Sequence, residues 1–492
     1  MNWDALKSVE TQGSLKPGAE LDIGGFNSLR VRHIRGKELV VLLPKLLLAG
    51  CLLILSAIGT GRFAEAQGPP SPALSAPAIQ SQTQPPQPHS EQAYSLPPDK
   101  LAKARSLNKI RLSLDIGGSL WGLLFLWWLL ASRTAARLEH WTQRIARRRW
   151  VQGLLFFALF IVISALAGLP IDMIGHTASR HYGISVQGWG GWFADQGKGL
   201  CIAEAGAFVL LLFNWIVRRW PRGYWLGVWL VTLPLMVIVA VGSPLIEPWF
   251  NKYEPLRKDH SGLVAKLERV VERTGTNIPP DRMFLMKASL KSNGLNAYVS
   301  GLGPTKRIVV WDTTAGRIPD DEVMFVFGHE SGHYVLHHIV KGLALSALSF
   351  FFVFWACARI AAWIASRFGD RWGIEPRPEV PLLGTRTGFL VLLLVFSVVS
   401  FLLEPASNTI SRYFEHQADI YGQEAIHGLV PNPQVTAVSG FNHLGEAWLE
   451  DPNPNPFIEF WLYSHPSVQT RATFAEHYDP WANGRHGEFF SQ

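Results

Sequence analysis

The residues with the clearest capacity for chemistry are two histidines and a glutamate that form an H-E-x-x-H pattern, His329-Glu330-Ser-Gly-His333. On a helix, residues four apart share one face with Cβ atoms about 5–6 Å apart, so both imidazoles can bind one zinc ion. Glu330 lies beside them, within reach of a proton on a metal-bound water. The pattern predicts one catalytic zinc per chain. The alternative is a helix that carries surface histidines.

A catalytic zinc usually takes three protein ligands, and a second segment offers the third. Glu415 and Asp419 are four residues apart on one expected helical face. We expect Glu415 to bind the metal and Asp419 to orient a ligand imidazole through its other ring nitrogen. Arg412, one turn earlier, could pair with either acid. His416 is a competing ligand, but on a regular helix it points about 100° away from Glu415.

Two further histidines, His337 and His338, follow the pattern closely. For both we expect contacts with solvent or lipid headgroups rather than metal binding. Asp320 and Asp321 supply the acids that favour a helix N-terminus, and this helix is expected to continue through Val340. The neighbouring sequence predicts a helix, a strand and a two-stranded hairpin that would position this helix; the expected ranges are 260–274, 282–287, 296–300 and 307–312.

The composition requires a membrane around these elements. Hydrophobic residues make up 48% of the 492-residue chain and charged residues only 17%. About 20 helical residues cross the hydrocarbon core, which makes seven apolar stretches candidate spans. They lie at about 39–59, 116–132, 153–172, 199–217, 224–245, 342–365 and 382–403. The net charge of +7 comes from arginines at the ends of these stretches, so it indicates membrane anchoring and no nucleic-acid partner.

We therefore expect a mainly α, multi-pass protein of about seven helices with a small α+β zinc-protease domain. The first span could instead be a signal peptide, because Ala64-Glu65-Ala66 resembles a cleavage site. The expected division is an N-terminal segment with the first span (1–61), a Pro/Gln-rich linker (62–98), spans two to five (99–245), the subdomain with the H-E-x-x-H helix (246–341), spans six and seven (342–403), and a C-terminal part with the third ligand (404–492).

At this point the sequence resembles a known family. H-E-x-x-H lies between the fifth and sixth expected spans, and S-R-x-x-E-x-x-A-D follows the seventh. This order is similar to that of the M48 metallopeptidases, in particular the Ste24-type CAAX prenyl proteases. The resemblance covers about residues 100–475. Other matching segments are Gly168-Leu-Pro170, His181-Tyr-Gly-Ile-Ser185, Asn296-Ala-Tyr298, Lys306-Arg-Ile-Val-Val-Trp-Asp-Thr313 and Tyr463-Ser-His-Pro-Ser467 with Arg471.

The resemblance implies helices that enclose a large chamber, with the zinc site facing it. It also implies His329, His333 and Glu415 as zinc ligands and Glu330 as general base. His465, in the family's H-P motif, is the first candidate to donate to the oxyanion, and Tyr463 and Arg471 are weaker candidates that could bind substrate; His465-Pro466 could instead only cap a turn. Asn296, Ala297 and Tyr298 could form an edge strand to which an extended peptide adds, or an ordinary sheet strand.

The expected function is hydrolysis of peptide bonds by a zinc endopeptidase that acts on peptide or protein substrates, lipidated ones included. One alternative is a protease for damaged membrane proteins. An alternative of another class is a transporter or receptor with a structural metal site, but such sites fill four zinc positions with protein ligands. Arginine-rich loops at 133–152 and 218–223 would place the zinc site away from the cytoplasm. The resemblance implies a site facing the cytosol, in a bacterial inner membrane or the endoplasmic reticulum, and we adopt it.

Overall fold

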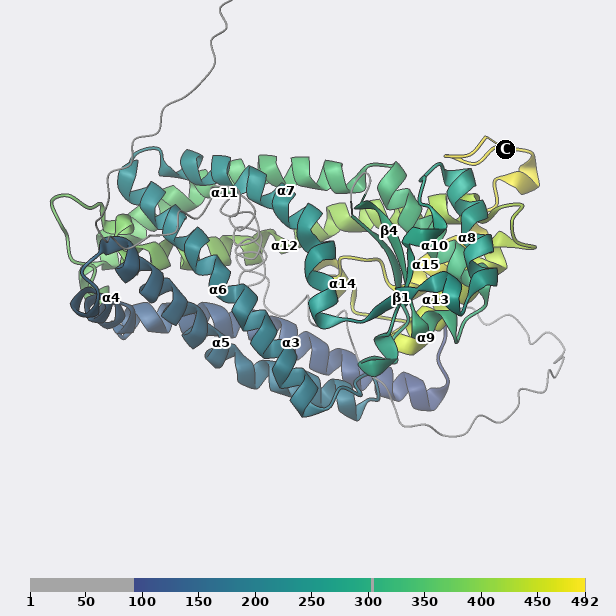
Figure 1. Ribbon diagram of the computed structural model, residues 1–492, viewed down its shortest axis with the longest axis horizontal. Coiled ribbons are helices and arrows are strands. Elements are labelled where there is room, and N and C mark those ends of the chain that lie inside the picture. The colour runs from purple at the N-terminus through teal and green to yellow at the C-terminus, as the bar shows by residue number, and fades with distance from the viewer. Residues whose placement is uncertain (1–92, 302–304, 492) are drawn as a thin grey trace, which may run out of the picture. The chain divides into compact units, whose positions relative to one another are not determined.

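The computed structural model describes residues 93–301 and 305–491 (Figure 1). The expected first span, at 39–59, and most of the Pro/Gln-rich linker lie outside these residues. The described elements are α3 (Pro98–Ala131), α4 (Thr134–Ile145), α5 (Arg149–His181), α6 (Trp189–Arg219), α7 (Tyr224–Phe250), β1 (Tyr253–Pro255), α8 (Ser261–Thr274), β2 (Met283–Met286), β3 (Ala297–Ser300), β4 (Arg307–Trp311), α9 (Asp312–Ala315), α10 (Asp320–Val335), α11 (His338–Phe368), α12 (Arg386–Ile426), α13 (Pro433–Trp448), α14 (Pro456–Leu462) and α15 (Val468–His477).

Within the described ranges, six helices are long and apolar enough to cross a membrane: α3, α5, α6, α7, α11 and α12. They overlap the six expected spans that fall in these ranges, although α3 ends at Ala131 and α12 begins at Arg386. Only 6% of the most apolar window of α11 is buried in the protein, against 56% for α6. Because exposed apolar surface of this extent is not tolerated in water, the outer helices must face lipid, and α6 lies further inside.

A small mixed sheet lies beside the membrane helices, with strand order β1-β2-β4-β3. β2 and β4 are parallel, β1 pairs antiparallel with β2, and β3 pairs antiparallel with β4. The predicted strand at 282–287 and the predicted hairpin are confirmed, whereas β1 was not expected. β3 pairs with one neighbour only, so it forms an edge of the sheet.

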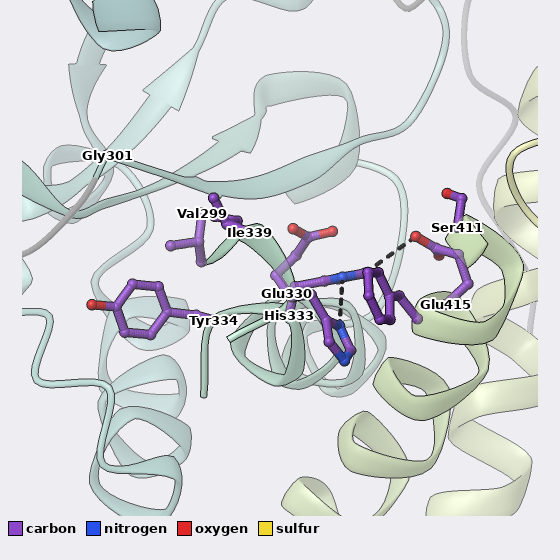
Figure 2. Close-up of a pocket in the computed structure, with 10 residues that line it drawn as sticks. Val299, Gly301, Glu330, His333, Tyr334, Ile339, Ser411 and Glu415 are labelled. Carbon is purple, nitrogen blue, oxygen red and sulfur yellow. Dashed lines mark hydrogen bonds and ion pairs between the residues drawn. The ribbon is translucent and has the colours of Figure 1, made fainter. Parts of the chain in front are cut away.

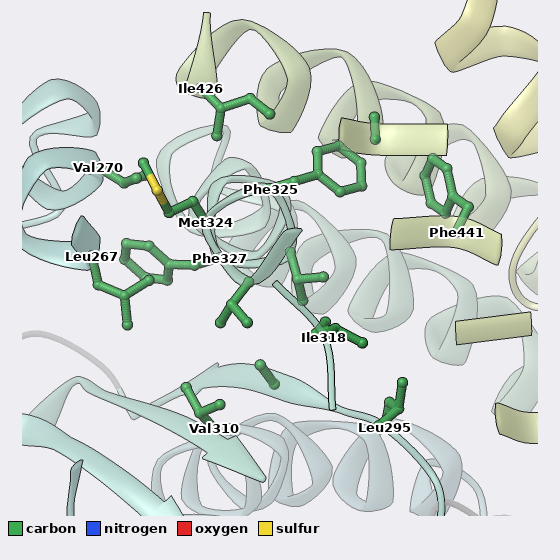
Figure 3. Packing of buried hydrophobic residues seen from close by; sticks show 14 of the residues in the cluster. Leu267, Val270, Leu295, Val310, Ile318, Met324, Phe325, Phe327, Ile426 and Phe441 are labelled. Atoms are coloured by element: carbon green, nitrogen blue, oxygen red, sulfur yellow. The ribbon is translucent and has the colours of Figure 1, made fainter. Parts of the chain in front are cut away.

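One hydrophobic core joins this sheet to the helices around it, and α10 lies at its centre (Figure 3). Phe325 and Phe327 of α10 are almost fully buried, and Phe325 meets Phe441 of α13 edge to face with ring centroids 5.1 Å apart. Val310 of β4 and Leu267 of α8 belong to the same core. The helix that carries the H-E-x-x-H pattern is therefore held on several sides by packing.

The expected single helix from 320 to 340 is wrong near its end, where the chain forms two separate helices. α10 ends at Val335, and His337 has φ 58°, in the left-handed region, before α11 begins at His338. No glycine or proline marks this break, which is why the sequence did not reveal it. The break changes the direction of the chain. The position of His338 relative to His333 therefore differs from the one it would have on a single continuous helix.

The sequence separates an apolar span that ends at residue 403 from a polar part that begins at residue 404. In the structure the span and the start of the polar part belong to one helix. α12 runs for 41 residues from Arg386 to Ile426, with Pro405 inside it, and it contains both the last span and the Glu415 segment. A membrane helix thus continues directly into the helix that supplies the third candidate ligand.

α10 and α12 approach each other closely because glycines line their contact. A Cβ added to Gly422 would lie 2.8 Å from the backbone N of His329, and one added to Gly328 would lie 3.0 Å from the backbone O of Gly422. A Cβ on Gly332 would lie 2.9 Å from Cβ of Tyr421. Backbone atoms cannot move aside as flexible side chains can, so the contact requires glycine at these positions.

We expect Gly422→Ala to separate α10 from α12 and to weaken metal binding. Overpacking of this kind costs about 1–3 kcal/mol, which exceeds the gain of up to about 1 kcal/mol from replacing glycine by alanine in a helix. The measurements are the thermal unfolding midpoint and the zinc dissociation constant of the purified protein.

Gly342→Ala in α11 is the matched control, because a Cβ there has no heavy atom within 4 Å. It should leave both quantities unchanged or raise the midpoint slightly. Equal zinc affinity in the two variants would contradict the role assigned to the glycine contact.

Candidate metal centre

The H-E-x-x-H residues lie in the buried middle and last turn of α10, next to a 330 Å³ cavity (Figure 2). Glu330 and His333 line this cavity together with Glu415 of α12. The wall opposite α10 includes Val299 of β3. Segments far apart in the sequence thus contribute to one small cavity.

Three side chains converge here in the arrangement that a metal ion needs. His329 Nε2 lies 3.1 Å from His333 Nε2 and 3.3 Å from Glu415 Oε2, and His333 Nε2 lies 3.2 Å from Glu415 Oε1. Tetrahedral ligands at zinc bond lengths of about 2.0–2.1 Å would be about 3.3 Å apart. Among the described residues, Glu415 Oε2 has no hydrogen-bond partner although it is buried. The donor set and its spacing therefore fit zinc.

His329 is held by a carboxylate on its far side. Its Nδ1 lies 2.9 Å from Asp419 Oδ1, so Asp419 sits where the sequence predicts the orienting acid. Burial lowers the pKa of His329, but the nearby carboxylates of Asp419 and Glu415 outweigh this and raise the pKa to about 10. A bound metal must therefore displace a proton from this ring.

Arg471 of α15 in turn fixes Asp419. Its Nε donates to Asp419 Oδ2 at 2.9 Å and its Nη2 to Asp419 Oδ1 at 2.6 Å, and Nη2 also lies 3.6 Å from Glu415 Oε2. Burial alone would lower the pKa of Arg471, but the charge of Asp419 raises it above its ordinary value. The guanidinium thus binds the acids behind the histidines. It does not point into open space where a substrate would bind.

Arg412 does not make the pair with an acid that the sequence suggested. Its Nη1 donates to the backbone carbonyls of Glu459, Phe460 and Tyr463, and its Nη2 to Thr409 Oγ1. These bonds satisfy carbonyls at the C-terminal end of α14. Arg412 therefore positions the turn that leads to His465.

His338 is a residue whose position the sequence did not predict. It is 4% exposed, stacks on Phe414 with ring centroids 4.5 Å apart, and so does not contact solvent or headgroups as expected. His338 Nδ1 lies 3.1 Å from His333 Nδ1, and His338 Nε2 lies 3.2 Å from Gln417 Oε1. Because the Gln417 oxygen only accepts, His338 Nε2 donates and its Nδ1 can accept from His333 Nδ1–H.

Two other histidines lie away from the centre. His337 is exposed, as the sequence predicts. His416, the competing ligand, is exposed on α12, and its ring meets Phe474 edge to face with centroids 4.5 Å apart. The structure therefore brings Glu415, and not its neighbour His416, to the two histidines of α10.

Glu330 points into the cavity beside the ligand atoms (Figure 2). Burial raises the pKa of its carboxyl group above the ordinary value, and the neighbouring His329 and His333 oppose this shift. The main chain of Val299 opposes this shift as well. A carboxyl group with a raised pKa is better suited to accept and return a proton near neutral pH than an ordinary glutamate.

His465 and Tyr463 lie on the segment after α14, with different surroundings. His465 Nε2 lies 3.3 Å from Glu415 Oε1, and its side chain is 58% exposed. Tyr463 OH instead donates to Asn108 Oδ1 of α3 at 3.1 Å. Only His465 reaches the cluster of ligand atoms.

The segment Asn296-Ala297-Tyr298 contributes main chain rather than side chains to the free edge of β3. Trp311 N donates to Asn296 O, so the alternating pattern of an antiparallel pair directs the N–H and C=O of Ala297 and Val299 away from β4. The Tyr298 hydroxyl donates to Glu247 Oε2 of α7 at 3.0 Å. The Tyr298 side chain therefore ties the sheet to a membrane helix.

Comparisons with known proteins agree with this fold and site. Residues 258–479 match the sequence model of peptidase family M48, and residues 77–252 match the model described as the CAAX prenyl protease N-terminal region with five membrane helices. The uncharacterized metalloprotease YhfN of Bacillus subtilis (strain 168) is 33% identical over 388 residues, which cover 78% of this chain and 87% of that protein.

Two further relatives are eukaryotic. CAAX prenyl protease 1 of Saccharomyces cerevisiae is 28% identical, over 65% of this chain and 71% of that protein. The crystal structure of S. mikatae Ste24p has a TM-score of 0.63 and 24% identity, and covers 77% of this chain and 90% of that chain. This likeness confirms the mainly helical fold. The large enclosed chamber stays a prediction.

Spanning helices that continue into a His-His-Glu cluster define a multi-pass membrane metallopeptidase. The chain belongs to peptidase family M48. Its substrates are therefore peptides or proteins. The alternative of a transporter or receptor with a structural metal site is not supported.

We expect His338→Phe to weaken zinc binding by about 10- to 100-fold, the usual cost of losing a partner that orients a metal-bound histidine. Phenylalanine keeps the stack on Phe414 but removes the acceptor for His333 Nδ1–H. The measurement is the zinc dissociation constant, from competition with a chelator.

His338→Asn should recover part of the affinity, because its side-chain oxygen can accept the same hydrogen bond. His337→Asn is the control, since asparagine tolerates the left-handed backbone at that exposed position. Native affinity in the His338→Phe protein would contradict the role of His338.

Proposed function

We propose that the protein is a zinc-dependent endopeptidase in which His329, His333 and Glu415 hold one zinc ion. The observation that carries this proposal is the mutual spacing of the three ligand atoms, 3.1–3.3 Å, with the Glu330 carboxylate beside them. Three protein ligands leave a fourth position for substrate or water, which is typical of catalytic and not of structural zinc sites.

When bound, zinc supplies Lewis-acid polarisation of a carbonyl group and of water. Glu330 acts as the general base that takes a proton from the attacking water and then delivers it to the nitrogen of the departing amine. Burial raises the pKa of Glu330, which favours its protonated form and so supports delivery of the proton to the amine. Asp419 and His338 hold the two imidazoles with their Nε2 atoms directed at the metal position.

We assign His465 the stabilisation of the negative charge that develops on the carbonyl oxygen. Ser464 Oγ lies 3.0 Å from His465 Nδ1, so the serine hydroxyl can donate to that nitrogen and leave the proton on Nε2. That Nε2 lies on the side of the Glu415 carboxylate. Tyr463 and Arg471 are less suited to this task, because their polar groups bind Asn108 and Asp419.

The free edge of β3 supports binding of an extended peptide by strand addition. Ala297 and Val299 direct main-chain groups outward, and Val299 lines the cavity together with Glu330. A peptide that pairs with this edge would pass directly over the general base. The role of Asn296, Ala297 and Tyr298 in substrate binding is therefore one of backbone pairing.

For the substrate, we propose a protein with a prenylated C-terminus. The support is the match of residues 77–252 to the CAAX prenyl protease N-terminal region and the similarity to the yeast CAAX prenyl protease 1. A second candidate, cleavage of damaged membrane proteins, is favoured by the higher identity to the bacterial metalloprotease YhfN. An active site that faces the cytosol stays part of the first proposal.

We expect Glu330→Gln to keep about one zinc per chain but to lose activity by about 10²- to 10⁴-fold, the usual contribution of a general base. Zinc content is measured by atomic emission and turnover with a quenched fluorescent peptide. Chelation should abolish the activity of the native protein, and added zinc should restore it.

Activity in the Glu330→Gln protein equal to that of the native protein would refute the assigned role. Loss of zinc together with activity would show that Glu330 helps to form the site. Glu322→Gln is not a suitable control, because Glu322 is buried and accepts bonds from Ser439 and His443; the exposed Glu379→Gln serves instead.

The two substrate proposals differ in what they predict for one peptide with and without its lipid. If prenylated proteins are the substrates, a farnesylated CAAX peptide should have kcat/KM at least about tenfold higher than the same peptide without the lipid, or about 1.4 kcal/mol. Both peptides are assayed in the same detergent, each at a peptide concentration that does not saturate the enzyme. Equal values would favour the second candidate.

A further inference from the structure

The basic charge of the chain is concentrated at the end of the membrane helices that lies away from the metal centre. Arginines are dense in three segments: six in 132–149, three in 218–223 and four in 367–386. With the four acids that these segments contain, their combined formal charge is +9, whereas the net charge of the whole chain is +7. Bonds between these segments join them, including Arg133 Nε to Arg371 O and Arg386 Nη2 to Arg149 O.

A cavity of 420 Å³ opens among these arginines, where α6 ends and α12 begins. Its lining includes two arginines, Arg218 and Arg377, and one acid, Glu379. Arg218 is half-buried and Arg377 exposed. Within the part of the chain that the structure describes, neither guanidinium makes a hydrogen bond or an ion pair. The cavity therefore presents two sets of unused donors.

Burial and neighbouring like charges act against the charge of Arg218 in the free protein, whereas Glu139 favours it. The like charges of Arg149 and Arg377 act on Arg218, and those of Arg149, Arg218 and Arg377 act on Arg386, which is 3% exposed. The nearby acid Glu139 accepts from Thr387 N at 2.9 Å and Thr387 Oγ1 at 2.8 Å and forms an ion pair with Arg386 Nη1 at 3.7 Å, so its oxygens are engaged away from Arg377. An anion in the cavity would relieve this repulsion.

The planar guanidinium fork matches the oxygens of a phosphate group better than it matches most other anions. The cavity lies at the ends of spanning helices, and Trp220 beside it is exposed as expected in the interfacial region of a membrane. In the interfacial region of a bilayer, phosphate groups belong to lipid headgroups. We propose that the cavity lined by Arg218 and Arg377 binds the headgroup phosphate of an anionic phospholipid.

The proposed site is separate from the peptidase centre. Glu415 follows Arg386 by 29 residues on the same helix (415 − 386), which corresponds to about 43 Å at 1.5 Å per residue. None of the residues that line the cavity takes part in the proposed catalysis. Changes in the cavity can therefore be tested while peptide cleavage reports that the protein is folded.

The experiment uses the full chain in neutral detergent, with short-chain phosphatidylglycerol as the probe. Binding is measured as the dissociation constant from native mass spectrometry. Arg218→Gln with Arg377→Gln removes the two unused guanidinium groups. Arg219→Gln with Arg222→Gln is the matched control, because it removes the same charge from exposed residues of the same segment that do not line the cavity.

We expect the first double variant to weaken phosphatidylglycerol binding by about tenfold per arginine and the control to change it less than about threefold. Equal weakening in both double variants would show a general charge effect and would overturn the proposal. So would equal binding of phosphatidylcholine and phosphatidylglycerol to the native protein.

Inorganic phosphate is the second probe. Binding of inorganic phosphate as tight as that of the lipid would show a site for a free anion and would overturn the assignment to a lipid. If the double variant fails to cleave peptide, Arg377→Gln alone is used, because Arg377 is exposed on the loop before α12. Native lipid affinity in this folded single variant would also overturn the proposal.

Discussion

The candidate metal centre depends on how closely two helices approach each other. His333 and Glu415 are 82 residues apart in sequence (415 − 333), yet their ligand atoms lie 3.2 Å from each other. This requires the backbones of α10 and α12 to touch, which the glycines at 328, 332 and 422 allow. Since a zinc ligand set tolerates displacements of only a few tenths of an ångström, this contact determines whether the site can form at all.

Behind the ligands, the two histidines are supported by different chemistry. His329 faces the Asp419 carboxylate, which Arg471 holds in place, whereas His333 faces the neutral ring of His338. A carboxylate increases the basicity of the imidazole it contacts, and a neutral ring does so much less. The two histidines are therefore unequal donors, although they occupy equivalent places in the H-E-x-x-H pattern.

The sequence was sufficient for those features that depend on local spacing. The pair His329 and His333, and the pair Glu415 and Asp419, each follow from four-residue spacing on one helix, and the apolar stretches predicted the six spans within the described residues. His338 was misjudged because the break at His337 carries no glycine or proline. That Arg471, and not Arg412, pairs with Asp419 could not be foreseen either, because it depends on where α14 and α15 pack against α12, which is a property of tertiary structure.

α12 joins the membrane-spanning part to the candidate metal centre as one continuous helix, with Pro405 inside it. Its first residues lie at one membrane surface, and Glu415 lies about 43 Å further along the same helix. A tilt of the helix by about 5° about its first turn would displace Glu415 by nearly 4 Å, which is more than the distance between two zinc ligands. Spanning helices tilt by such angles when the bilayer thickness changes. The soluble part must therefore clamp α12 firmly, and the thickness of the host membrane becomes a mechanical variable of the enzyme.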